Sequence, residues 1–186
     1  MRKQLFNILA LVALSGATLF LASAKVHARD KNLLVSSFQD LEVLGEIQVV
    51  VTDGKTPKAT ASGDQNMLSR LKVERSGSTL RLRLQDRSSF GRNVGVTPLI
   101  VKISNRQLRN IRVQGNATVS VDTLSQSGIS ALEILGSGTL NVENVKADQL
   151  NIAIFGNGVI SIQSGTARIS RVNLEGAAKV DAAGFT

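Results

Sequence analysis

The C-terminal half of the chain repeats one pattern of apolar and polar positions around a glycine that returns about every 20 residues. The glycines are separated by 21, 20 and 20 residues and stand at Gly115, Gly136, Gly156 and Gly176. Apolar residues occupy the positions two and four before each glycine and four and six after it. A fixed period of this length predicts one supersecondary unit that is stacked on copies of itself.

Alternation within each repeat predicts short β-strands, because every second residue of a strand faces the same side. Each repeat glycine is expected to supply a tight turn with positive φ, which is a structural role. The side chains predicted to face inward are Ile111, Leu132, Ile152 and Val172; Val113, Ile134, Ile154 and Leu174; Val119, Leu140, Ile160 and Val180; and Val121, Val142, Ile162 and Ala182.

Residues 38–104 alternate in the same way but without the regular glycine. They predict a part rich in strands, with a hairpin at 71–85 and an irregular polar loop at 86–97. Residues 29–37 are expected to form a loose lead-in, and no helix is expected because helical periodicity is absent. We expect residues 38–104 to cover one end of the stack, and no segment is visible as a cover for the end near Phe185.

These elements predict an all-β fold in which residues 108–186 form a β-helix-like solenoid of about 20-residue coils. Stacked coils pair each strand with its copies about 4.8 Å away. The alternative is an antiparallel β-sandwich of hairpins that turn at each glycine. Coils are favoured because every repeat contains a second break, at 125–130, 146–149 and 164–167.

The first 28 residues have the order of parts of a secretory signal peptide. A basic start at Met1-Arg2-Lys3 precedes an apolar run over 5–22, and small-residue cleavage sites end at Ala24 and Ala28. An uncleaved membrane anchor is the alternative, since the run approaches the length that spans a bilayer. Cleavage is expected to leave 29–186 as one domain, without a membrane span, in the periplasm or on the surface of a bacterium.

The chain contains no cysteine, which excludes disulfides, thiolate nucleophiles and cysteine-ligated metals. Cleavage after Ala28 would lower the formal net charge from +8 to +5. A positive charge of this size permits contact with anionic lipid or glycan but identifies no partner. Nucleic acid is not expected as the partner of an exported protein.

The residue types that most catalytic sites use are missing from the predicted mature chain. The only histidine is His27, in the predicted signal, and the chain has no tyrosine or tryptophan. Ser–His and Cys–His catalysis are therefore excluded, and a zinc site would need carboxylates alone. No phosphate-loop, dinucleotide or calcium-loop motif is present. We expect a protein that is not an enzyme and that holds no cofactor and no metal.

Asp122 and Glu143 are the remaining candidates for catalysis, because each stands seven residues after a repeat glycine. Stacking would make them neighbours, with Gln163 at the equivalent place in the next coil. A pair this close could serve the proton transfers of a polysaccharide lyase or hydrolase, or hold Ca²⁺. Two carboxylates fall short of the ~6–8 oxygens that Ca²⁺ takes, so solvated outward side chains are the favoured interpretation.

Arg81 and Arg83 are the candidates for ligand binding, because they alternate with leucines and should point outward. They lie in a basic region, 70–92, that could contact phosphate on lipid or glycan. The favoured interpretation is a charged face that keeps an edge strand soluble.

Two segments resemble the Ser-Gly-Ser-Gly-type signature of a bacterial family. They read Leu-Gly-Ser-Gly-Thr-Leu at 135–140 and Phe-Gly-Asn-Gly-Val-Ile at 155–160, and residues 38–51 and 80–82 also resemble that family. It is the head GIN domain family, labelled auto-transporter adhesin, whose function is undefined. The resemblance covers about 36–184 and implies a right-handed β-helical fold without agreed catalytic residues. The first and last repeats depart from the signature at 115–117 and 176–178.

The leading functional hypothesis is an exported, non-enzymatic, adhesion-like module that presents a rigid β-solenoid face to an envelope protein or glycan. One alternative is a carboxylate-based polysaccharide lyase or hydrolase that uses Asp122 and Glu143. Another is a passive structural or assembly module of the cell envelope, whose edge coils pair with another subunit.

Overall fold

The alternating residues form an all-β structure, so that prediction is confirmed. The computed structural model describes residues 29–85 and 98–186. The elements of these residues are β1 (Arg29–Leu33), β2 (Asp40–Leu44), β3 (Gln48–Thr52), β4 (Lys58–Gly63), α1 (Gln65–Arg70), β5 (Leu71–Ser76), β6 (Thr79–Leu84), β7 (Ile100–Ser104), β8 (Asn110–Gly115), β9 (Thr118–Gly136), β10 (Thr139–Gly156), β11 (Val159–Glu175) and β12 (Lys179–Asp181).

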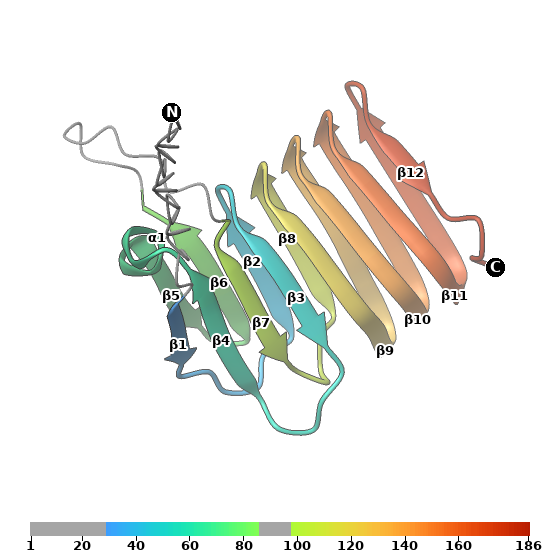
Figure 1. The fold of residues 1–186 in the computed structure, drawn as a ribbon. Helices are drawn as coiled ribbons and strands as arrows, with labels where there is room; N and C mark the ends of the chain where they lie inside the picture. Colours follow the sequence, from blue (N-terminus) through green and yellow to red (C-terminus); the bar gives the residue numbers. More distant parts are fainter. Residues whose placement is uncertain (1–28, 86–97) are drawn as a thin grey trace, which may run out of the picture.

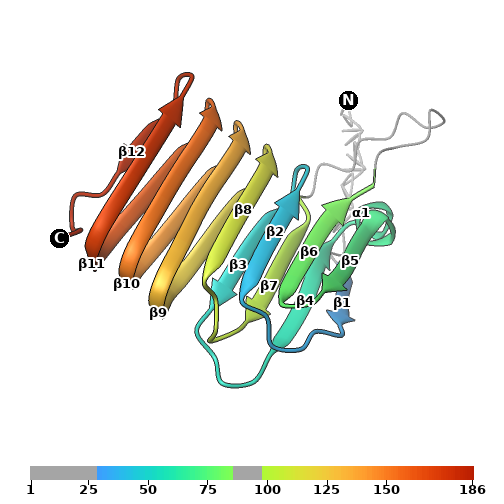
Figure 2. The same ribbon diagram turned by 180° about the vertical axis from the view of Figure 1, so that it is seen from behind.

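The strands belong to one twelve-stranded sheet that folds back on itself, so that two walls face each other (Figures 1 and 2). The long strands β9, β10 and β11 contribute one half to each wall. The first wall consists of β5, β6, β2, β8 and the second halves of the long strands. The second wall consists of β1, β4, β7, β3, the first halves of the long strands and β12.

The long strands run parallel, with equivalent residues of successive repeats side by side. Ile134, Ile154 and Leu174, each two residues before its glycine, pair directly with one another in order. The alternative of antiparallel hairpins turning at each glycine is therefore wrong for the repeats. Among the described residues, antiparallel pairing joins only β1 to β4, β4 to β7 and β5 to β6.

A fifth glycine, Gly45, stands before the four repeat glycines in the stack. It lies between β2 and β3, which pair in parallel with β8 and β9, and its backbone lies beside Gly115. We call each unit of strand, glycine turn and strand a rung. At Gly136 φ is 124°, and a Cβ would lie 2.9 Å from the Gly115 carbonyl oxygen. Close stacking of the turns therefore requires a residue without a side chain.

The segment between the first and second rungs covers one end of the stack, so the expectation for residues 38–104 holds for the part after β3, whereas β2 and β3 form the first rung. Here β6 extends the first wall beside β2, and β7 extends the second wall beside β3. Beyond them β5 pairs with β6, and β4 and β1 complete the second wall. The predicted hairpin at 71–85 is confirmed as β5 and β6.

Two elements at this end differ from what the sequence predicts. Residues 29–33 were expected in a loose lead-in but form β1, whose Asp30 accepts a hydrogen bond from Ser62 Oγ on β4 at 2.5 Å. The helix α1 was also not expected; Asp64 caps it by accepting from the Asn66 amide at 2.8 Å. β1 is exposed over its first four residues and α1 buries Leu68 alone, so neither element has the apolar periodicity on which the prediction relies. The predicted signal peptide, 1–28, and the predicted loop, 86–97, lie outside the described residues.

The apolar core fills the space between the walls and ends before the last rung. Ile152 and Ile154 are 5% and 0% exposed, as their inward assignment predicts. At the same positions of the last rung, Val172 and Leu174 are 53% and 44% exposed. These two predicted inward positions are therefore not buried, because no described strand pairs with β11 there on the side away from β10. Within the described residues, no helix has the length and hydrophobicity needed to cross a bilayer.

Candidate binding site

Charged side chains form a row across five strands on the outer face of the first wall. At one register level β5, β6, β2, β8 and β9 carry Glu74, Arg81, Glu42, Arg112 and Glu133, in that order. The charge changes sign at every step. Opposite charges placed directly across neighbouring strands stabilise a sheet, so these five residues form a coherent unit. We call them the charge row.

Two ion pairs in the charge row are short, and one of their carboxylates is buried. Arg81 Nε donates to Glu42 Oε2 at 2.7 Å, and Arg112 Nε donates to Glu133 Oε2 at 2.6 Å. Glu42 is 8% exposed, and its Oε1 accepts a further bond from Gln114 Nε2 at 3.1 Å. Both oxygens of Glu42 are therefore held by charged or polar partners, which fixes its orientation.

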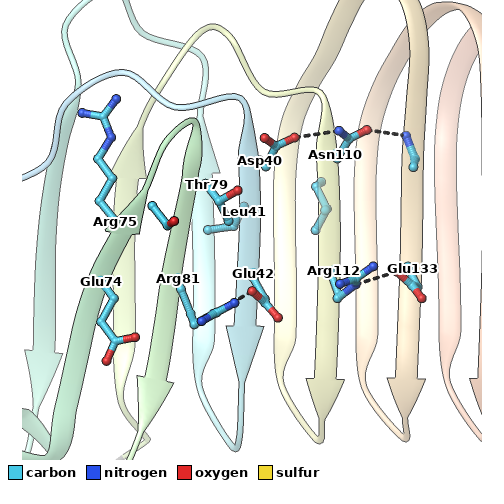
Figure 3. A pocket seen from close by; sticks show the side chains of 13 residues that line it. Asp40, Leu41, Glu42, Glu74, Arg75, Thr79, Arg81, Asn110, Arg112 and Glu133 are labelled. Carbon is cyan, nitrogen blue, oxygen red and sulfur yellow. Dashed lines mark hydrogen bonds and ion pairs between the residues drawn. The ribbon is translucent and has the colours of Figure 1, made fainter.

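A second polar row lies two residues closer to the start of β2, β8 and β9. Asn110 Nδ2 donates to Asp40 Oδ1 at 2.6 Å, and Asn110 Oδ1 accepts from the Ala131 amide at 3.0 Å. Ser78 Oγ donates to Asp40 Oδ2 at 2.6 Å. Figure 3 shows Asp40 and Asn110 beside each other, with Glu42, Arg112 and Glu133 at the next level.

Residues of these two rows line a hollow of about 580 Å³ in the outer face (Figure 3). Arg75 at its rim is held by bonds to Ser36 Oγ, to the Ser37 carbonyl at 3.0 Å and to the Gly77 carbonyl at 3.0 Å. The lining contains four carboxylates and three guanidinium groups, which nearly cancel in charge. Its members are Asp40, Leu41, Glu42, Glu74, Arg75, Ser76, Thr79, Arg81, Asn110, Ile111, Arg112, Ala131 and Glu133.

The two arginines that the sequence singled out both lie on the outer face of β6, and both are paired. Their side chains are 46% and 45% exposed for Arg81 and Arg83. Arg81 pairs with Glu42, and Arg83 pairs with Glu74 at 3.2 Å. An incoming phosphate would have to compete with these carboxylates. In the described part of this basic region, the charges of Arg81 and Arg83 are therefore offset by Glu42 from β2 and Glu74 from β5.

Asp122 and Glu143 lie on the second wall, apart from the hollow. Their neighbours pair as Val121 with Val142 and Thr123 with Asn144, which places the two carboxylates at one register level, as stacking predicts. Gln163 follows at the same level of β11, because the residues on either side of it continue the register. Among the described residues, no group of three or more His, Cys, Asp or Glu could hold a metal ion.

The sequence did not reveal the hollow, because its residues come from five strands that are distant along the chain. Alternation marks Glu42 and Glu133 as outward, but it does not say which strands are neighbours. The strand order β5, β6, β2, β8, β9 decides that, and it depends on how the segment after the first rung folds back. Arg81 was the only member of the charge row among the sequence candidates.

Comparisons with known proteins agree on the family and on the fold. A family model described as "Putative auto-transporter adhesin, head GIN domain" matches residues 37–186. No curated protein matches the chain. A solved putative adhesin from Parabacteroides distasonis ATCC 8503 has a TM-score of 0.59 and 17% identity, and the match covers 87% of this chain and 75% of that one.

Two further solved structures are similar at TM-scores of 0.51. One is a putative adhesin from Bacteroides fragilis NCTC 9343, at 16% identity, with coverage of 84% of this chain and 97% of that one. The other is a putative cell adhesion protein from Clostridium sporogenes ATCC 15579, at 11% identity, with coverage of 86% and 100%. At such identities the structures show a shared fold alone. The match of the family model over 37–186 shows that the chain belongs to the head GIN domain family of putative auto-transporter adhesins.

Proposed function

We propose that this protein is an exported, non-enzymatic binding module that holds a neutral, hydroxyl-rich glycan of the cell envelope in the hollow of its first wall. The observation that carries the proposal is the lining of that hollow by paired charges. Carboxylate, guanidinium and amide groups present several donors and acceptors for hydroxyl groups. Because four carboxylates face three guanidinium groups, strongly anionic polymers are not favoured.

The scaffold supports such a role because it holds the lining groups still. We propose that it is a right-handed β-solenoid of about 20-residue coils, on the grounds that successive rungs pair in parallel and that their turn glycines stack. Repeat scaffolds of this kind present extended faces that bind without rearranging. Preorganised groups lose little conformational entropy on binding, which favours affinity from modest contacts.

Two further observations agree with a binding role outside the cytoplasm. The family and the similar solved structures carry adhesin descriptions. The predicted signal sequence, with its basic start and small-residue cleavage sites, is consistent with export. We propose the periplasm or the cell surface as the location.

The test is a glycan array probed with the exported protein and two matched variants. Ala131→Arg places a long side chain in the hollow, whereas Asn141→Arg adds the same side chain on the second wall, where its strand neighbours are Ser120 and Ser161, outside the lining. We expect the wild-type protein and Asn141→Arg to bind neutral glycans equally, and Ala131→Arg to bind at least about tenfold more weakly. Silence of the wild-type protein on all envelope glycans, or equal binding by Ala131→Arg, would contradict the proposal.

A further inference from the structure

Among the described residues, the last rung has an open sheet edge on both walls. On the first wall, residues 169–175 of β11 pair with β10 on one side and with no described strand on the other. On the second wall, β11 is the only strand of residues 29–85 and 98–186 that pairs with β12. Figure 2 shows β11 and β12 as the final strands of the row. Val172 and Leu174 on this edge strand are 53% and 44% exposed, whereas Ile152 and Ile154, their partners on β10, are buried.

The open edge of β11 carries a charge pattern that complements itself. If a second copy of β11 pairs antiparallel with the first about Asn173, then Arg171 faces Glu175 twice. In the same register Val172 faces Leu174, which continues the apolar interior. Centring the pair on Arg171 instead would place two arginines opposite each other, and centring it on Val172 would place Glu175 opposite Ile169. The register about Asn173 therefore places opposite charges across from each other on the outer face. It also places apolar residues across from each other on the inner face, because directly opposed cross-strand residues share one face.

The open edge of β12 has the same property. An antiparallel pair centred on Val180 places Lys179 of each copy opposite Asp181 of the other. Val180, which packs partly buried against the core, then faces its own copy on the inner side. Two independent edges thus carry charge patterns that suit pairing with themselves.

One two-fold axis can serve both edges. Asn173 lies three residues before Gly176 and Val180 lies four residues after it, so the two centres stand at nearly the same distance from the turn. An axis normal to both walls therefore passes near both centres. It joins the first wall to the first wall and the second wall to the second wall, which is the isologous contact of a two-fold dimer.

We propose that a second copy of this chain docks on the last rung, pairing β11 with β11 about Asn173 and β12 with β12 about Val180. The dimer continues both walls without a break and covers Val172 and Leu174. Pairing also removes a hazard, since an exposed apolar sheet edge is a template for aggregation. Because the axis is normal to the walls, the hollows of both copies open on one side. This last consequence rests on the proposed function, and it would make binding to a surface bivalent.

Charge exchange tests the register directly. In Arg171→Glu, glutamates face each other twice across the dimer axis, and in Glu175→Arg, arginines do. Mixed in equal amounts, the two variants restore two opposite-charge pairs. We expect sedimentation to give a dimer for the exported wild-type protein, dissociation constants at least about tenfold weaker for each variant alone, and dimers again in the mixture. A wild-type monomer at all concentrations, or a mixture no tighter than its components, would overturn the proposal.

A second measurement is independent of charge and uses the absence of native cysteine. Asn173→Cys places one thiol from each copy opposite the other near the axis, where cross-strand Cα atoms ~4.5–5.5 Å apart suit a disulfide. The matched control is Ala153→Cys, at the same register level one rung inward. Mild oxidation by oxidised glutathione should form a disulfide between two copies of Asn173→Cys, whereas Ala153→Cys at the same concentration should form no covalent dimer. Equal cross-linking of both variants would contradict the docking mode, and neither result depends on whether the hollow binds glycan.

Discussion

The two ends of the stack are built from the same alternating strands but finish differently. At the first end, β6 and β7 extend the walls, and inward residues such as Val43 and Val49 are 0% exposed. At the last end, Val172 and Leu174 occupy inward positions of the repeat and are about half exposed. The local pattern is alike, so the presence of a next strand decides burial. In a stacked fold, whether a side chain is buried therefore depends on the strand of the neighbouring rung as well as on its own position in the repeat.

The largest effect should come from placing a charge at one position of two successive rungs. Ile154→Asp should lower the free energy of unfolding by about 4 kcal/mol, because the carboxylate would be buried without a partner. Leu174→Asp makes the same kind of change one rung further on, where the side chain reaches water. We expect it to cost less than about 1 kcal/mol in urea titrations of dilute protein. Equal losses would show that both positions are buried.

A glycine in the stacked column should matter more than a glycine in the hairpin of the covered end. At Gly156 φ is 127°, and a Cβ would overlap the Gly136 carbonyl oxygen. Gly156→Ala should therefore cost about 3 kcal/mol. Gly77 has φ of 58° with open space around a Cβ, so Gly77→Ala should cost only about 1 kcal/mol. Thermal unfolding of the two variants measures the difference, and a reversed order would contradict the stacking of the turns.

Within the charge row, the buried carboxylate of Glu42 should contribute more than the exposed carboxylate of Glu74. Glu42→Ala removes a carboxylate that is 8% exposed and accepts from both Arg81 and Gln114, so it should cost about 2 kcal/mol. Glu74→Ala removes the partner of Arg83 in an exposed pair and should cost less than about 0.5 kcal/mol. Chemical denaturation compares them. Similar costs would indicate that the row is solvated throughout.

The smallest effect should be a gain in stability. The Ser130 hydroxyl is buried and has no hydrogen-bond partner among the described residues. Ser130→Ala should therefore raise the free energy of unfolding by about 0.5 kcal/mol, since it removes an unsatisfied polar group. Ser170 stands two rungs later at the same register level and is exposed, so Ser170→Ala should leave stability unchanged. A loss of stability in Ser130→Ala would show that its hydroxyl does find a partner.

The sequence predicted the repeats well because every element of that prediction was local. The spacing of Gly136 and Gly156, and the alternation around Ile152 and Ile154, follow from residues near one another in the chain. The rung at Gly45 was missed because a long segment that covers the first end separates it from Gly115, which breaks the period. The strand β1 and the helix α1 were missed because both are short and mostly exposed, so they carry no apolar periodicity.

The candidate site was less predictable than the fold, for a related reason. Alternation identifies outward residues but cannot order strands that lie far apart in the sequence. Arg81 could be marked as outward, whereas its partner Glu42 comes from the first rung, on the other side of β4 and α1 in the chain. The stacking of Asp122 beside Glu143 was foreseen because the repeat itself aligns them. Contacts within the repeat can thus be predicted from the sequence. Contacts between residues separated by the segment between the first and second rungs cannot.

Amide hydrogen exchange at two successive rungs tests the central claim most directly, namely that the next strand determines what each position of the repeat does. In dilute protein, we expect the amides of 150–155 to exchange only on global unfolding, because β10 lies between β9 and β11. Alternate amides of 170–175 should exchange rapidly. The amides that face the open edge of β11 have no carbonyl oxygen of a further described strand to accept a hydrogen bond. Equal, strong protection of both segments in dilute protein would contradict the account.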